Sequence, residues 1–271
     1  MDYILYLLIF CIGTVFGSFF TLAIYRIPLR QDITHTRSYC PNCNHKLSFW
    51  DMIPILSYLF LGGKCRYCKQ KIRPRYLLLE VLSGIVFVLF AMSIKLSLFT
   101  LTKESMIYFI AGILYISTLF ILAGIDKEKV KIEKPVLLFG FICVGIYIIY
   151  LCIVEKDINI YRYVIYFTLI CILSIISIIY LRKKAKQSYV IDAILLLLLM
   201  AMYTYEIVSI YTIIMTLLAI GVQGILTKKK NKKNKSVKID KEINMKIPVA
   251  FYLCTANIFT LIASNMYVFY R

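Results

Sequence analysis

The sequence has few glycines and little negative charge. Its 11 glycines are scattered over 271 residues, and neither a P-loop nor a G-x-G-x-x-G run occurs, so the sequence predicts no nucleotide site. Only 14 residues are Asp or Glu, against 32 Lys or Arg. The first apolar run also lacks the basic n-region and the small-residue cleavage site of a secretory signal peptide, so we expect it to stay attached.

Apolar residues, by contrast, make up 61% of the chain. A soluble domain of this size could not bury so much apolar surface, whereas runs of about 20 apolar residues suit the hydrocarbon core of a bilayer. The sequence therefore predicts an all-α integral membrane protein with about eight transmembrane helices, over residues 3–25, 76–94, 106–125, 136–154, 160–181, 189–205, 207–226 and 248–269. The sixth and seventh ranges can also be read as one bent apolar run.

The basic residues predict the orientation in the membrane. With the N-terminus outside, the segments 26–75, 127–135, 182–188 and 227–247 fall on one side and hold 27 of the 32 Lys and Arg. The positive-inside rule makes that side cytoplasmic. The lysine-rich run 228–235 is compatible with nucleic acid, but beside a membrane span it favours anionic lipid headgroups, so we expect the lipid bilayer as a partner and no nucleic acid.

The polar, basic segment 26–75 contains two C-x-x-C pairs separated by 21 residues. Two such pairs supply the four thiolates of a closed tetrahedral zinc site, formed here by Cys40, Cys43, Cys65 and Cys68. A pair of disulfides is the alternative, and it requires an oxidising compartment. We therefore expect three parts: a first transmembrane helix (1–25), a cytoplasmic zinc-binding insert (26–75) and a transmembrane domain (76–271).

Two carboxylates are candidates for catalysis. Asp126 ends the third predicted span and Asp192 begins the sixth, both near the predicted cytoplasmic side, and an acidic residue at membrane depth is costly and functional by default. Two adjacent carboxylates that share one proton are the arrangement of aspartic proteases. Alternatively, Asp126 is an interfacial residue beside Lys127. Glu80 in the second span is a third candidate, with a structural ion pair as its other reading.

Over residues 13–84 the chain resembles the type IV prepilin peptidases, polytopic aspartyl proteases of the bacterial plasma membrane. The resemblance rests on ordered motifs: Gly17-Ser18-Phe19, Tyr25-Arg26-Ile27-Pro28, Cys40-Pro41-Asn42-Cys43, Asp51-Met52-Ile53-Pro54, Gly63-Lys64-Cys65-Arg66-Tyr67-Cys68 and Arg73-Pro74-Arg75-Tyr76, followed by Glu80 and Gly84. It implies an enzyme that cleaves the leader from prepilin-like membrane proteins at the cytoplasmic face and, in many members, N-methylates the new N-terminus with S-adenosylmethionine. It also implies that Asp126 and Asp192 are the catalytic pair.

The chain departs from the family pattern around the second aspartate. Ile191 precedes Asp192 where the family has glycine, and Ile194 stands where the family has a basic residue. Three hypotheses follow: an active prepilin peptidase with or without the methyltransferase step, a diverged member acting as a methyltransferase alone or as a pilus-assembly scaffold, and an unrelated zinc-bearing membrane scaffold or transporter.

Overall fold

The computed structural model describes residues 2–35, 37–99, 101–154, 159–184, 189–233 and 247–270, and within them it is helical without named β-strands. The long helices are α1 (Asp2–Arg26), α3 (Arg75–Ser93), α4 (Lys103–Lys129), α5 (Lys134–Val154), α6 (Ile160–Lys184), α7 (Tyr189–Tyr203), α8 (Glu206–Lys233) and α9 (Val249–Tyr270). This confirms the all-α prediction, with a helix in each of the eight expected ranges.

Seven of these helices are long and apolar enough to cross a membrane, and α7 is the shorter one. At 1.5 Å per residue the 15 residues of α7 extend only about 22 Å, less than the roughly 30 Å of the hydrocarbon core. Its C-terminal end is capped by Arg162, which donates to the carbonyl oxygens of Ala201 at 2.8 Å and Thr204 at 2.7 Å. A cation there satisfies carbonyl groups that have no partner within the helix, so the predicted sixth and seventh spans are two separate helices.

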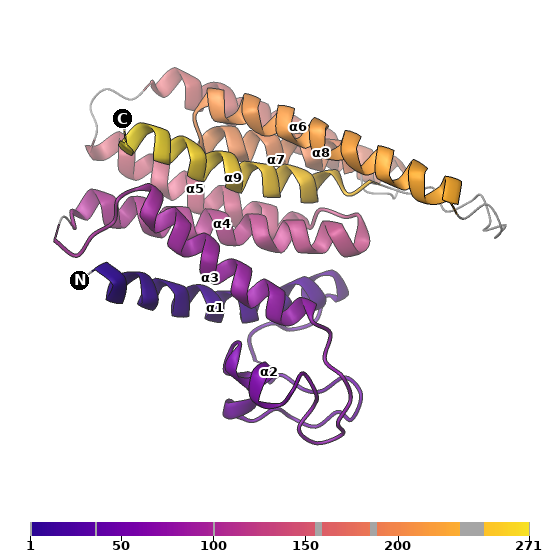
Figure 1. Ribbon diagram of the computed structural model, residues 1–271. Helices are drawn as coiled ribbons and strands as arrows, with labels where there is room; N and C mark the ends of the chain where they lie inside the picture. The colour runs from indigo at the N-terminus through magenta and orange to yellow at the C-terminus, as the bar shows by residue number, and fades with distance from the viewer. Residues whose placement is uncertain are drawn as a thin grey trace. The chain divides into compact units, whose positions relative to one another are not determined.

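The chain divides into two compact units, residues 1–117 with 265–271, and residues 118–264. In the first unit α1 and α3 lie side by side (Figure 1). A Cβ added to Gly13 would lie 2.7 Å from the Cα of Gly84, and one added to Gly17 would lie 2.7 Å from the Cα of Glu80. Such small residues allow close backbone approach between membrane helices. The Ser83 hydroxyl also donates to the Gly13 carbonyl at 2.7 Å.

The insert lies between α1 and α3 in the chain. It contains the short 3₁₀ helices η1 (Ile27–Leu29) and η2 (Phe49–Met52), the helix α2 (Leu56–Phe60), and two isolated β-bridges. Because it has few long elements, its fold depends on turns and on side-chain contacts.

The core of the second unit contains fully buried apolar side chains of α4 and α7. They include Leu122 and Ile125 of α4 and Leu196 and Leu199 of α7. Polar contacts join α8 to α9: the hydroxyls of Thr212 and Thr260 are 2.8 Å apart, and Asn257 donates to Thr212 at 3.2 Å. The lysine-rich run 228–235 lies outside the residues whose side chains the structure describes.

Candidate active site and metal centre

The first cysteine pair lies in a tight turn closed by its own backbone. The Cys40 N–H donates to the His45 carbonyl at 3.0 Å, and the Asn44 N–H donates back to the Cys40 carbonyl at 2.8 Å. A β-bridge between Tyr39 and Lys46 closes the turn. Asn44 has a φ of 54°, in the left-handed region that asparagine tolerates better than most residues.

The second pair repeats this geometry at the same offsets. The Cys65 N–H donates to the Gln70 carbonyl at 2.8 Å, the Lys69 N–H donates to the Cys65 carbonyl at 3.1 Å, and a bridge joins Lys64 to Lys71. Lys69, the equivalent of the asparagine in the first turn, has a φ of 60°. Two copies of one knuckle therefore present their thiols in the same way.

The two knuckles bring the four predicted thiols into one cluster. The sulfurs of Cys40, Cys43, Cys65 and Cys68 all lie within 4.8 Å of one another. The Cys40 and Cys68 sulfurs are 3.8 Å apart, too far for a disulfide of about 2.05 Å. That distance matches the edge of a tetrahedron with metal–sulfur bonds of about 2.3 Å, which is about 3.8 Å. The donor set therefore fits a tetrahedral metal ion.

One thiol of the cluster is prepared for ionisation. The backbone N–H of Gln70, followed by the side-chain amide of Asn42 at 3.6 Å, lowers the pKa of Cys68 to about 6. A metal ion binds the thiolate rather than the thiol, and these donors favour the thiolate form of Cys68.

The knuckles are connected to the rest of the insert by Asp51. Its carboxylate accepts from Arg66 at 2.6 Å and from the Ser48 N–H and hydroxyl at 3.2 and 2.8 Å. Burial raises the pKa of Asp51, but the hydrogen bonds from Arg66 and Ser48 outweigh burial and hold it below its usual value. The rings of His45 and Tyr67 lie with centroids 3.6 Å apart and are tilted by 34°, and His45 is not part of the four-cysteine cluster.

The two candidate catalytic carboxylates lie in the second unit. Asp126 is near the C-terminal end of α4 and Asp192 is in the first turn of α7, and neither has any solvent-exposed surface. A buried carboxylate needs hydrogen-bond donors or opposite charge around it.

Asp126 receives its donors from two other helices. The Tyr189 hydroxyl, at the start of α7, donates to Asp126 Oδ2 at 3.0 Å, and the Phe251 N–H, at the start of α9, donates to the same oxygen at 2.9 Å. The Ala250 N–H donates in turn to the Tyr189 hydroxyl at 3.0 Å. The first N–H groups of a helix have no partner within it and carry partial positive charge, so α9 provides a site for a carboxylate.

The other oxygen of Asp126, Oδ1, is buried and has no hydrogen-bond partner among the described residues. Asp192 follows Tyr189 by three residues, a spacing that places both on one side of α7. The ammonium of Lys134, at the start of α5, lies 3.9 Å from Asp192 Oδ1 and donates to the Ser177 hydroxyl at 2.7 Å. Tyr189 therefore links the first turn of α7, which carries Asp192, to Asp126.

Three contributors to this cluster were not among the residues singled out from the sequence: Tyr189, Lys134 and the first amides of α9. Of these, only Tyr189 could have been singled out from the sequence, because it precedes Asp192 by three residues and so lies on the same side of a helix. Glu80 has a different environment, since its Oε2 accepts from the Ile55 N–H of the insert at 2.8 Å.

Comparison with known proteins agrees with the resemblance seen in the motifs. Residues 11–94, which run from α1 through the insert to α3, match the family described as the Bacterial Peptidase A24 N-terminal domain. Proteins named prepilin leader peptidase/N-methyltransferase are 36% identical over 128 residues in Klebsiella pneumoniae, 39% over 89 residues in Vibrio cholerae and 33% over 132 residues in Bacillus subtilis. The resemblance to the type IV prepilin peptidase family is confirmed.

These matches cover 44%, 30% and 49% of this chain and 51%, 35% and 50% of the three relatives, in the same order. The chain thus spans about half or less of the length of these prepilin peptidase relatives. No solved structure matches the chain.

Proposed function

We propose that the protein is a membrane-embedded aspartic endopeptidase that removes the leader from type IV prepilin-like proteins at the cytoplasmic face of the bacterial plasma membrane. The observation that carries the proposal is that two carboxylates are fully buried in the second unit: Asp126 accepts a hydrogen bond from Tyr189, and Asp192 follows Tyr189 by three residues on α7. The names of the relatives support the substrate class.

In the proposed reaction, the ionised member of the pair takes a proton from a water molecule while the protonated member donates a hydrogen bond to the scissile carbonyl oxygen. The water oxygen bonds to the carbonyl carbon, and the new amine leaves with a proton from the pair. Tyr189 and the Phe251 N–H hold Asp126 by Oδ2, which leaves Oδ1 for the water or the substrate.

We further propose that Cys40, Cys43, Cys65 and Cys68 bind a structural zinc ion, because their four sulfurs lie within 4.8 Å of one another and a four-cysteine donor set is typical of closed zinc sites. Zinc would fix the two knuckles to each other. The excess of basic residues in the segments 26–75, 127–135, 182–188 and 227–247 supports a cytoplasmic insert.

The decisive test of the peptidase proposal is substitution of each carboxylate. Asp126→Asn and Asp192→Asn keep the shape of the side chain but remove its acid–base exchange, so each should abolish cleavage of a prepilin-like substrate in reconstituted vesicles. Glu128→Gln is the matched control, since Glu128 is exposed two residues beyond Asp126 on α4. Cleavage at the parental rate by either Asn variant would remove that residue from the mechanism.

We also propose that the protein transfers a methyl group from S-adenosylmethionine to the N-terminus of the processed substrate, as the relatives' names indicate for those proteins. Supplying a substrate that already lacks its leader separates the two activities. The Asn variants should still methylate it, as measured with a labelled methyl donor. Methylation by the parental protein without any cleavage would favour the methyltransferase-only alternative.

A further inference from the structure

We propose that the insert docks on the membrane surface through an apolar patch that enters the headgroup region of an anionic leaflet. The patch consists of five side chains of η2 and α2: Phe49, Trp50, Leu56, Leu59 and Phe60. This docking is independent of the proposed peptidase activity, since none of the five residues belongs to the carboxylate cluster.

All five side chains of the patch are exposed. Phe49 and Trp50 are each 70% exposed, Phe60 is 84% exposed and Leu59 is 61% exposed. The rings of Phe49 and Trp50 contact each other edge to face at 6.1 Å, and η2 packs on α2. Single exposed apolar residues are common, but a contiguous group of large ones marks an interaction surface.

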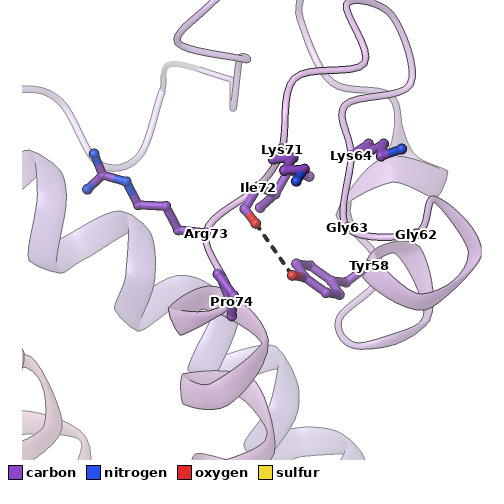
Figure 2. Close-up of a pocket in the computed structure, with 8 residues that line it drawn as sticks. All are labelled: Tyr58, Gly62, Gly63, Lys64, Lys71, Ile72, Arg73 and Pro74. Atoms are coloured by element: carbon purple, nitrogen blue, oxygen red, sulfur yellow. Dashed lines mark hydrogen bonds between the residues drawn. The ribbon is translucent and has the colours of Figure 1, made fainter.

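The orientation of α2 is fixed by Tyr58, on the side of the helix away from the patch. Figure 2 shows Tyr58 turned toward Ile72, to whose carbonyl its hydroxyl donates at 3.4 Å. A Cβ on Gly63 would lie 2.9 Å from the Tyr58 ring, so glycine allows this close packing. Leu56, which is 50% exposed, shares a helical face with Leu59 and Phe60, three and four positions later. That face points away from Tyr58.

The depth of α2 is fixed by a hydrogen bond to a membrane helix. The Ile55 N–H, directly before α2, donates to Glu80 Oε2 at 2.8 Å. Glu80 lies five residues after the first residue of α3, which is about 7.5 Å along the helix. Apolar faces at a membrane surface are buried by roughly 5–10 Å. With the first residue of α3 placed at the membrane surface, the contact therefore holds the start of α2 at the depth of the headgroup–acyl boundary.

The backbone at Ile55 supports a specific position for α2. Ile55 has a φ of 62°, a conformation that is rare for a β-branched residue and persists only where the surroundings impose it. Two hydrogen bonds hold this residue: its N–H donates to Glu80, and its carbonyl oxygen accepts from the Leu59 N–H at 3.0 Å.

The charge of the insert selects an anionic leaflet. Segment 26–75 holds 10 basic residues against two acidic ones. Both acidic side chains are engaged within the insert, Asp32 by Thr34 and His35, and Asp51 by Arg66.

Cations also lie where the insert enters the membrane helix. Lys64, Lys71 and Arg73 line a shallow pocket beside Pro74, directly before α3 (Figure 2). Aromatic residues flanked by Lys and Arg are typical of the membrane interface. The lipid surface therefore complements both the apolar patch and its surrounding charge.

The test uses Trp50, which is the only tryptophan of the chain. The full-length protein is reconstituted into vesicles of phosphatidylcholine and phosphatidylglycerol whose acyl chains carry bromine near the ester group. We expect bromine to quench Trp50 fluorescence and iodide to quench it weakly. Strong iodide quenching without bromine quenching would overturn the proposal. So would protection from both, which would mean that protein covers the patch.

Two variants sharpen this test. Leu59→Ser combined with Phe60→Ser should abolish bromine quenching of Trp50, because it removes the exposed face of α2. Phe99→Ser is the matched control, since Phe99 is 77% exposed but lies in the connection between α3 and α4. Quenching that survives in the double variant would contradict the role of α2.

The charge contribution is tested separately with Lys64→Gln and Lys71→Gln. Each change should lower the ratio of docked to undocked insert roughly fivefold on vesicles containing phosphatidylglycerol. Neither should change it on pure phosphatidylcholine. Equal effects on both kinds of vesicle would overturn the assignment to anionic lipid.

Discussion

The insert and the carboxylate site bring their reactive groups together in different ways. In the insert, each cysteine pair is held by backbone hydrogen bonds within residues 39–46 or 64–71. Around Asp126, the donors are 63 and 125 residues away in the sequence. The first arrangement depends on local turns and, in our proposal, on a shared metal ion, whereas the second depends on the packing of whole helices. Perturbations of one should therefore leave the other intact.

The largest expected effect comes from the cysteines. Cys40→Ser combined with Cys65→Ser should release the bound metal and unfold the knuckles, because roughly 10 kcal/mol or more of metal-binding free energy is coupled to the folding of such sites. Elemental analysis and limited proteolysis of segment 26–75 measure this. Asp126→Asn, as the control, should retain the metal. Parental protein that contains no zinc when purified without chelators would contradict the metal assignment.

A smaller effect is expected from pH at Asp51. Its pKa is lower in the folded insert than in the unfolded chain, so its contribution is fully present above the ordinary value of about 3.9 and is lost as pH falls through the lower, folded pKa. Asp51→Asn should cost about 1.5–3 kcal/mol at neutral pH. The difference from the parental protein should shrink below about pH 4.

The measurement for Asp51 is the denaturant dependence of metal release from both proteins at several pH values. Protonation of the cysteine thiols promotes metal release at acidic pH in both proteins. Subtracting the value of the Asp51→Asn protein from that of the parental protein removes this shared effect. A difference that stays constant down to strongly acidic pH would show that the Asp51 charge does not stabilise the insert.

At the carboxylate site, Tyr189→Phe should lower kcat about tenfold, or about 1.4 kcal/mol, with little change in KM. The change removes the hydroxyl that donates to Asp126 and accepts from Ala250, and Tyr189 acts as a positioning residue. The pH profile of kcat should shift as well, which a purely structural role would not produce. Tyr205→Phe is the control, because Tyr205 is 71% exposed between α7 and α8.

The smallest effect concerns the backbone of the two knuckles. Lys69→Gly should stabilise the insert by about 1 kcal/mol, since a left-handed φ costs a side-chain-bearing residue about that much. Asn44→Gly should gain less, because asparagine tolerates this region. Thermal release of the metal ranks the two variants, and a destabilised Lys69→Gly protein would contradict the conformational argument.

The difference between local turns and long-range helix packing also explains why the sequence predicts the insert better than it predicts the carboxylate site. A C-x-x-C spacing specifies a local turn, so Cys40, Cys43, Cys65 and Cys68 could be assigned to one cluster. The eight helical ranges follow from apolar length alone. The role of Lys134 beside Asp192, by contrast, depends on how α5 packs, and no local pattern encodes that.

The structure also bears on Ile191, which stands where the family has glycine. Residues 189–203 form a regular helix, and Ile191 is not among the described residues with positive φ. A glycine's access to left-handed conformations is therefore not needed at this position. The isoleucine is compatible with the backbone that presents Asp192.

The dependence of Asp126 on the first turn of α9 has a consequence for biogenesis. The Phe251 N–H joins the site only after α9 has been made, since α9 follows both α4 and α7 in the chain. Until α9 is inserted, Asp126 lacks a backbone donor and Tyr189 lacks the amide of Ala250. If the pair is catalytic, a chain in which α9 has not yet been inserted is inactive. The synthesis and insertion of α9 then determine when proteolysis begins in the membrane.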